Sequence, residues 1–287
     1  LKKRTSIVLT SDKNYNGHGA IVVNSMEELQ EELKKYNSDD IYVIGYYNST
    51  DIEGVTNKGD YDGLVLKYNK DGNIVWKRSF GGSNSDVFLN LTLDDDGIIV
   101  NGYFKSTDIL DLSNNGKEDA IILKYDFNGN LLWNLGIGGN NYDSLNDIYF
   151  TRDKGNMFHV TTQSTDIDGI VNENSQLYFM VKYDSNQNLL WKRQFLRRDH
   201  IYSKVIYLKN DSFVELGYSP LINDESLTSN GGYDALVVKY DKDGNVKWKR
   251  NWGGSGNDMF YDGVYTKDED LILFAISNSS DVVGINN

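Results

Sequence analysis

Six polar residues in the second half of the sequence could form a binding site for a partner. They lie in two segments where an otherwise regular pattern breaks down, and they combine cationic, carboxylate and amide side chains: Arg197, Arg198, His200, Asn223, Asp224 and Glu225. Such a mixture can make an asymmetric patch that complements the charged groups of a partner. The alternative is that one repeat has drifted, with the two arginines pairing with surplus acidic residues.

A second polar group occupies equivalent positions in four successive repeats. Its members are Asn90, Asp147, Lys204 and Asp262. We expect them on the innermost strand of each repeat, where two carboxylates at a suitable separation could hold a metal or hydrolyse a glycosidic bond. Because Lys204 lies between Asp147 and Asp262 in repeat order, a buried ion-pair network is the simpler expectation.

Two acidic segments resemble oxygen-rich cation loops. They are Asp94-Asp95-Asp96-Gly97 and Asp241-Lys242-Asp243-Gly244-Asn245. An EF-hand loop has its glycine in the sixth position, whereas the glycine here is fourth, as a hairpin turn requires. We therefore expect turns and neither a metal nor another cofactor, with a weak Ca²⁺ site as the alternative. The sequence also lacks nucleophile-elbow, zinc-protease, phosphate-loop and dinucleotide-binding motifs.

An internal repeat of about 57 residues positions all of these side chains. Four tryptophans lie 57, 58 and 57 residues apart: Trp76, Trp133, Trp191 and Trp248. Each follows a Lys-Tyr-Asp or Lys-Tyr-Asn phrase, and in three copies a Gly-Gly pair comes after the tryptophan. A Ser-Thr-Asp phrase recurs with the same period, beginning at residues 49, 106 and 164. A fixed period of this length is typical of repeat architectures.

Each repeat contains four short runs rich in β-branched and aromatic residues, separated by Gly, Asn and Asp turns. In the second copy these runs are Val87–Leu93, Ile98–Phe104, Asp119–Asp126 and Asn130–Ile137. Four antiparallel strands per repeat are typical of β-propeller blades. The sequence therefore predicts an all-β chain, a five-bladed β-propeller of four-stranded antiparallel blades that forms a single domain over 1–287. The blades are expected at 28–82, 86–139, 143–196, 200–254, and 258–287 plus 1–25.

The last blade has to be completed from both ends of the chain. Near the C-terminus the fifth copy has only two runs, Met259–Thr266 and Asp270–Ser277. We expect the N-terminal runs Thr5–Asp12 and Gly19–Val23 to pair with them, because closure removes exposed sheet edges. Segment Ser25–Tyr36 has a capping-box sequence typical of a helix. Its place in the repeat requires a strand, so we expect a strand in its second half, with a helical turn before it as an option.

Strand order also indicates where a site should lie. The loops that carry Ser-Thr-Asp and Gly-Gly-Ser share one face of the predicted blades, and short Asp/Gly hairpins occupy the other. Longer and more irregular loops are the usual carriers of function. We therefore expect function on the face of the Ser-Thr-Asp and Gly-Gly loops.

The combined pattern of Ser-Thr-Asp, Lys-Tyr-Asp-x-x-Gly-Asn-x-x-Trp and Gly-Gly-Ser resembles the bacterial SBBP-type β-propeller repeat family. The similarity extends from about residue 41 to the end of the chain, and more weakly over residues 1–40. Members of this family are typically parts of secreted or cell-surface bacterial proteins. The resemblance thus implies a fold and a location outside the cell, and it implies no catalytic residues.

Composition excludes several classes of function. The chain has 42 Asp and Glu against 29 Lys and Arg, a net charge of −13, which argues against binding to nucleic acid or to anionic membranes. It has no cysteine, and no apolar run approaches the ~18 residues of a membrane span.

Together these observations predict a non-enzymatic, secreted or cell-surface bacterial propeller that presents loops to a protein or glycan partner. A lectin-like binder with repeated loop pockets and a glycoside hydrolase that uses the axial carboxylates are the alternatives. Because Leu1 is not a natural start, we expect a monomeric domain of a larger protein.

Overall fold

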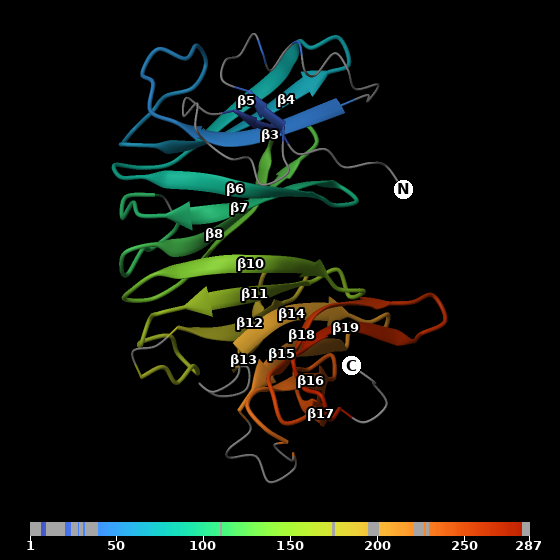
Figure 1. The fold of residues 1–287 in the computed structure, drawn as a ribbon. Helices are drawn as coiled ribbons and strands as arrows, with labels where there is room; N and C mark the ends of the chain where they lie inside the picture. Colours follow the sequence, from blue (N-terminus) through green and yellow to red (C-terminus); the bar gives the residue numbers. More distant parts are fainter. Residues whose placement is uncertain are drawn as a thin grey trace. The chain divides into compact units, whose positions relative to one another are not determined.

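The fold consists of β-strands that pair mainly with their neighbours in sequence (Figure 1). The computed structural model describes residues 7–9, 21–23, 28, 31, 40–109, 111–173, 176–194, 201–220, 227 and 230–282. The chain divides into two compact units, residues 1–145 and residues 146–287. The prediction of a single domain over 1–287 therefore stays a prediction.

Unit 1 contains a short parallel strand pair and two antiparallel sheets. The parallel pair joins β1 (Ile7–Leu9) and β2 (Ile21–Val23). The first antiparallel sheet has three strands, β3 (Asp40–Tyr47), β4 (Asp62–Asn69) and β5 (Ile74–Phe80). The second has four strands, β6 (Asp86–Leu93), β7 (Gly97–Phe104), β8 (Asp119–Asp126) and β9 (Leu131–Ile137).

Unit 2 contains two four-stranded sheets and one two-stranded sheet; its first strand begins just before the boundary between the units. The first sheet has the order β10 (Asp143–Phe150), β11 (Asn156–Thr162), β12 (Leu177–Tyr183) and β13 (Leu189–Gln194). The second has the order β14 (Ile201–Tyr207), β15 (Phe213–Ser219), β16 (Asp234–Tyr240) and β17 (Val246–Trp252). The last consists of β18 (Asp258–Tyr265) and β19 (Leu271–Ser277).

The predicted all-β fold of antiparallel four-stranded sheets is confirmed for the second, third and fourth repeats. In the second repeat the four strands match the predicted runs to within one residue at each end. The middle strands β7 and β8 are buried over nearly their whole length, which explains their almost continuous apolar sequences. No pairing among the described strands closes these sheets into a ring, so five blades stay a prediction.

The predicted completion of the last blade by the N-terminal strands is not confirmed. β18 and β19 form a sheet of their own, while β1 and β2 pair with each other, in parallel. The N-terminal runs have lost the Lys-Tyr-Asp and Trp phrases that shape the outer hairpin in the other copies. A parallel pair cannot be joined by a tight hairpin turn, so β1 and β2 do not reproduce the outer half of a blade.

Within the segment Ser25–Tyr36, the structure describes Glu28 and Glu31, and both have helical backbone. The remaining residues of this segment lie outside the described residues, so the predicted innermost strand is not tested there.

The Asp or Asn of each Lys-Tyr-Asp phrase closes the outer hairpin of its sheet. In β8, for example, Asp126 Oδ1 accepts hydrogen bonds from the N–H groups of Asn128 and Asn130, both at 2.8 Å. These donated hydrogen bonds hold the pKa of Asp126 below its usual value. Gly129 completes the turn with a positive φ of 80°, a conformation in which glycine is favoured. The repeat phrase thus encodes a turn.

Candidate functional site

The six residues predicted to form an asymmetric patch cannot be placed. Arg197, Arg198, His200, Asn223, Asp224 and Glu225 all lie outside the described residues. The patch therefore stays a prediction.

The four axial positions are described, and three of them follow a β-bulge. The register of the innermost strand shifts just before Asn90, Lys204 and Asp262. Lys204 forms an ion pair with Asp262, whereas Asp147 accepts a hydrogen bond from the Tyr149 hydroxyl. The side chains of Lys204 and Asp262 are 43% and 41% exposed. A buried network is therefore wrong for this pair, because bulges bend strands and re-aim their side chains, and here the pair is left in contact with solvent.

We expect the change Lys204→Met to alter the free energy of unfolding by less than about 1 kcal/mol, because an exposed ion pair is screened and gains little over hydration. Urea unfolding of Lys204→Met beside Asp262→Asn measures the effect. A loss of more than about 2 kcal/mol in either variant would mean that the pair is an energetically important part of the fold after all.

The recurrent Gly-Gly-Ser and Ser-Thr-Asp phrases lock two loops together. Asp86 accepts hydrogen bonds from the Gly82 N–H (2.8 Å) and the Ser106 hydroxyl (2.6 Å), and Asp108 accepts one from the Ser83 N–H (2.9 Å). The same contacts recur between β17 and β19, among Gly254, Ser255, Asp258, Ser279 and Asp281. The same phrases thus make the same contacts at these two junctions, which gives them a structural role on the face where we expected function.

The two acidic segments have their oxygen atoms engaged by protein groups. Asp94 and Asp96 each lie 2.6 Å from Lys124 Nζ. In the second segment, Asp241 Oδ1 accepts a hydrogen bond from the Asp243 N–H at 3.0 Å. Ca²⁺ requires six to eight oxygen ligands, so these contacts favour the turn interpretation over a cation loop.

The part of the chain that the structure describes has neither a metal-binding cluster nor a membrane-spanning helix. There is no cluster of three or more His, Asp or Glu side chains that could hold a metal ion. There is also no helix with the length and apolar character needed to cross a bilayer.

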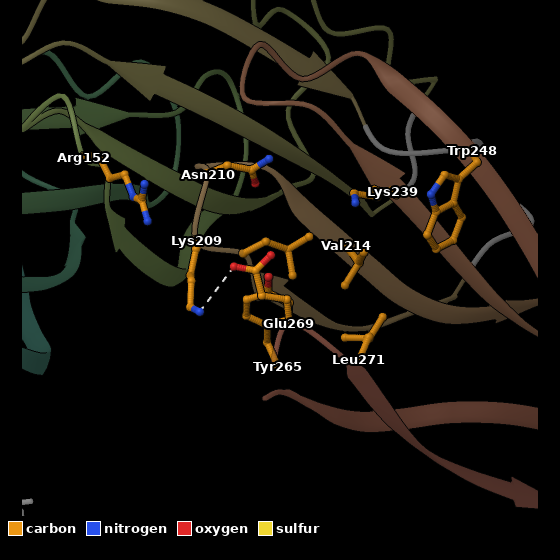
Figure 2. Close-up of a pocket in the computed structure, with 10 residues that line it drawn as sticks. Arg152, Lys209, Asn210, Val214, Lys239, Trp248, Tyr265, Glu269 and Leu271 are labelled. Atoms are coloured by element: carbon orange, nitrogen blue, oxygen red, sulfur yellow. Dashed lines mark hydrogen bonds and ion pairs between the residues drawn. The ribbon is translucent and has the colours of Figure 1, made fainter. Parts of the chain in front are cut away.

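A pocket of about 450 Å³ lies in unit 2 (Figure 2). Its polar and aromatic lining comes from the turns and strand ends of β14 to β19 and from the β10–β11 turn: Arg152, Lys209, Asn210, Lys239, Trp248, Tyr265 and Glu269. Lys209 forms an ion pair with Glu269 (3.3 Å) and donates a hydrogen bond to the carbonyl of Lys267 (3.0 Å). Three cations against one carboxylate make this pocket cationic in a chain that is strongly acidic overall.

Lys239 differs from the lysines at the same position in the other repeats. Each of those lysines forms an ion pair with an aspartate: Lys67 with Asp40 (3.0 Å), Lys124 with Asp94 (2.6 Å) and Lys182 with Asp153 (2.8 Å). Lys239 has no ion pair with any described residue. Asn210 occupies the position of Asp153 in the next repeat. Asp153 accepts a hydrogen bond from the Gly155 N–H (3.1 Å), and Asn210 accepts the equivalent one from the Ser212 N–H (3.2 Å). The side-chain amide of Asn210 keeps the hydrogen bond of the turn but offers Lys239 no carboxylate.

Among the described residues no hairpin turn covers Trp248, which leaves this side of the pocket open. Trp76 lies beneath the outer turn of the next sheet, where its Nε1 donates to the carbonyl of Phe127 (3.1 Å). Trp191 lies in the same way against the turn between β16 and β17. Gly244 of that turn is so close that an added Cβ would be 3.2 Å from the indole ring of Trp191. Beyond β19 the described residues provide no further strand pair, so Trp248 is only partly buried.

A glutamate and a histidine with shifted pKa values are buried outside the pocket. Glu215 in β15 accepts a hydrogen bond from the Tyr240 hydroxyl (2.7 Å), and burial raises its pKa from 4.5 to about 7. His159 in β11 is fully buried, and desolvation lowers its pKa to about 3, which keeps the imidazole neutral.

Comparison with known proteins finds similarity in fold alone. No family model and no curated protein matches the sequence. A mutant of the apocarotenoid oxygenase of Synechocystis is 9% identical over 75% of this chain and 49% of its own, with a TM-score of 0.41. A chimera of that oxygenase with RPE65 is 8% identical over 75% and 49%, with a TM-score of 0.40. A member of the DUF4221 family from Bacteroides vulgatus is 12% identical over 74% and 68%, with a TM-score of 0.33.

These findings contradict the prediction of a non-enzymatic module that presents loops to a protein or glycan. The oxygenases among the structural neighbours are enzymes, and none of the comparisons shows a binding function. The prediction is therefore wrong as made, and its lectin and glycosidase alternatives are withdrawn with it. This chain spans about half the length of the oxygenases, and the similarity is too low to assign it their reaction.

The cationic pocket was not among the predicted sites. The predicted departures from the repeat lie in the long loops, whereas the decisive departure is Asn210 in a short turn. Comparing each repeat's lysine with the residue expected to pair with it could have revealed that Lys239 lacks its aspartate.

Proposed function

We propose that unit 2 binds a small anionic ligand with a planar apolar part in the pocket of Arg152, Lys209, Lys239, Trp248, Tyr265 and Glu269. The observation that carries this proposal is Lys239, which has lost the carboxylate that pairs with its equivalents and lines an open pocket instead. A cation that has no ion pair among the described residues gains most from a phosphate or carboxylate that reaches it.

The aromatic side chains supply the second half of the recognition. Trp248 and Tyr265 line the same pocket as the three cations, so a ring can lie against them while its anionic group meets Lys239 (Figure 2). Ligand pockets commonly join an apolar wall with a few convergent polar groups in this way. The ion pair between Lys209 and Glu269 holds the Lys209 ammonium at the pocket wall.

We expect phenyl phosphate to bind this pocket and the uncharged benzyl alcohol to bind far more weakly. Isothermal titration calorimetry should show that Lys239→Met weakens phenyl phosphate at least about tenfold, because a charge-assisted hydrogen bond is lost. Lys242→Met is the matched control, because Lys242 is exposed in the neighbouring turn and pairs with Asp243. Equal affinity of the two variants, or no binding by the unaltered chain, would contradict the proposal.

For the fold, we propose that the repeats are blades of a five-bladed propeller of the SBBP type, with β18 and β19 as the inner half of the fifth blade. The regular period of the tryptophans and the repeated turn and loop phrases support this proposal. A location outside the bacterial cell, the absence of a cofactor and a monomeric state within a larger protein remain proposals on the same basis.

A further inference from the structure

We propose that Tyr149 and Tyr207 form a site of oxidative cross-linking, at which a one-electron oxidant such as a haem peroxidase with hydrogen peroxide joins their rings as dityrosine. The new bond would tie β10 to β14 within unit 2. Neither tyrosine lines the cationic pocket, so the proposal does not depend on the small anionic ligand proposed above.

The two rings lie closer together than those of any other tyrosine pair among the described residues. Their centroids are 3.2 Å apart and their planes are inclined by 20°, which is a stacked arrangement. Two further pairs, Tyr46–Tyr61 and Tyr218–Tyr233, meet edge to face, with centroids 5.5 Å apart and planes at 84° and 87°. Groups that are held within about 3–3.5 Å of each other react as if they were at very high concentration. Tyr149 and Tyr207 are therefore the described pair best placed for radical coupling.

Neighbouring groups hold both rings in place. The Tyr149 hydroxyl donates a hydrogen bond to the carboxylate of Asp147 and lies 3.4 Å from the carbonyl oxygen of Val205 in β14. The Tyr207 hydroxyl donates to Met180 Sδ (3.3 Å). Both tyrosines are half-buried and pack against the core cluster of unit 2. The rings are thus already oriented for coupling and still reach the surface, where an oxidant can act on them.

The reaction balances with one hydrogen peroxide for each cross-link. Each tyrosine gives one electron to the peroxidase and loses its hydroxyl proton, which Asp147 accepts from Tyr149 and solvent water accepts from Tyr207. The two phenoxyl radicals form a C–C bond between the ring carbons next to their oxygen atoms. The hydrogen on each of these carbons then moves as a proton to the oxygen of its own ring. The two electrons and two protons that are released reduce the peroxide to two water molecules.

The cross-link would connect two sheets covalently. β10 is the first strand of one four-stranded sheet in unit 2, and β14 is the first strand of the next. The chain has no cysteine, so it cannot form a disulfide between them. A bond between residues 149 and 207 closes a loop in the unfolded chain and restricts its conformations, as a disulfide does. We therefore expect the cross-linked protein to resist unfolding better.

Oxidation of the full chain with a haem peroxidase and hydrogen peroxide, followed by trypsin digestion and mass spectrometry, tests the proposal. The expected product joins segment 125–152, which contains Tyr149, to segment 205–209, whose one tyrosine is Tyr207. Its yield should exceed that of either edge-to-face pair at least about tenfold, because the stacked rings need less movement. The yield should also stay constant when the protein is diluted about tenfold, because the coupling is intramolecular. Absence of this product, a yield that falls on dilution, or an equal yield from the edge-to-face pairs would overturn the proposal.

Three conservative variants locate the bond. Tyr149→Phe and Tyr207→Phe should each abolish the product, since phenylalanine keeps the ring but has no hydroxyl to oxidise. Tyr142→Phe is the matched control, because Tyr142 lies in the same tryptic segment as Tyr149 and is 41% exposed. The product should persist in this control. Its persistence in Tyr149→Phe, or its loss in Tyr142→Phe, would place the bond elsewhere and overturn the proposal.

Urea unfolding measures the effect of the bond on the fold. The urea midpoint of the parent should rise on oxidation, whereas that of Tyr149→Phe treated in the same way should not, because only the parent gains the closed loop. The same change in midpoint for both proteins would overturn the inference that the bond ties β10 to β14.

Discussion

Replacing Glu215 with glutamine should make the stability of the protein less dependent on pH, and should raise the free energy of unfolding at pH 8 by roughly 3 kcal/mol. Glu215 is buried in β15, and its hydrogen-bond partner, the Tyr240 hydroxyl, is neutral. Burial therefore favours the protonated carboxyl and raises its pKa from 4.5 to about 7. Glutamine keeps an acceptor for Tyr240 and carries no charge.

The sign of the effect follows from proton binding. Between pH 4.5 and about 7 the folded chain holds the Glu215 proton while the unfolded chain releases it. Stability from this group is therefore fully present below pH 4.5 and is lost as the pH rises to about 7. At pH 4 the parent and Glu215→Gln should be similarly stable, and above pH 7 the variant should be the more stable of the two.

Urea unfolding at pH 4, 6 and 8 measures this difference, with Glu53→Gln as the control because Glu53 is exposed. The control should follow the parent curve at each pH. If the difference between parent and Glu215→Gln is the same at all three pH values, then Glu215 is not a buried acid of raised pKa.

Replacing Asp86 with alanine should destabilise the fold by about 3–5 kcal/mol. Asp86 is 1% exposed and accepts hydrogen bonds from the Gly82 N–H (2.8 Å), the Ser106 N–H (3.2 Å) and the Ser106 hydroxyl (2.6 Å). Alanine leaves these donors buried without an acceptor. The loops before β6 and after β7 would then lose one of the contacts that join them.

The same urea experiment at pH 7 tests this prediction against Asp71→Ala, a change in the exposed turn after β4 that should cost less than about 0.5 kcal/mol. Asp86→Asn should fall between the two, because an amide has one acceptor atom where the carboxylate has two. A loss below about 1 kcal/mol for Asp86→Ala would contradict a structural role for the repeated aspartate.

The sequence predicted the local structure of the repeats well, for a physical reason. Each strand is bounded by residues with turn chemistry, such as Asp126 and Gly129, and each middle strand has an apolar run that only burial on both faces explains. Because the phrases recur in several repeats, the bounds of a strand can be compared between copies of the same strand. This is why β6 to β9 match the predicted runs so closely.

The site was harder to predict because it depends on what one repeat lacks. Asn210 is an ordinary turn residue on its own, and its significance appears only when Lys239 is found beside it without an aspartate. The loop phrases misled in the opposite direction. Ser106 and Asp108 recur in a polar loop, which suggested binding, but their hydrogen bonds go to the loop before β6.

Pairing of strands in chain order also has a consequence for how the molecule folds. In β6 to β9, and again in β14 to β17, every strand pairs with the strand that precedes or follows it. Closing such a sheet requires only short loops, which favours rapid formation of each sheet once its residues are available. On the ribosome we therefore expect the sheets to form one after another as they emerge, with β18 and β19 the last to assemble.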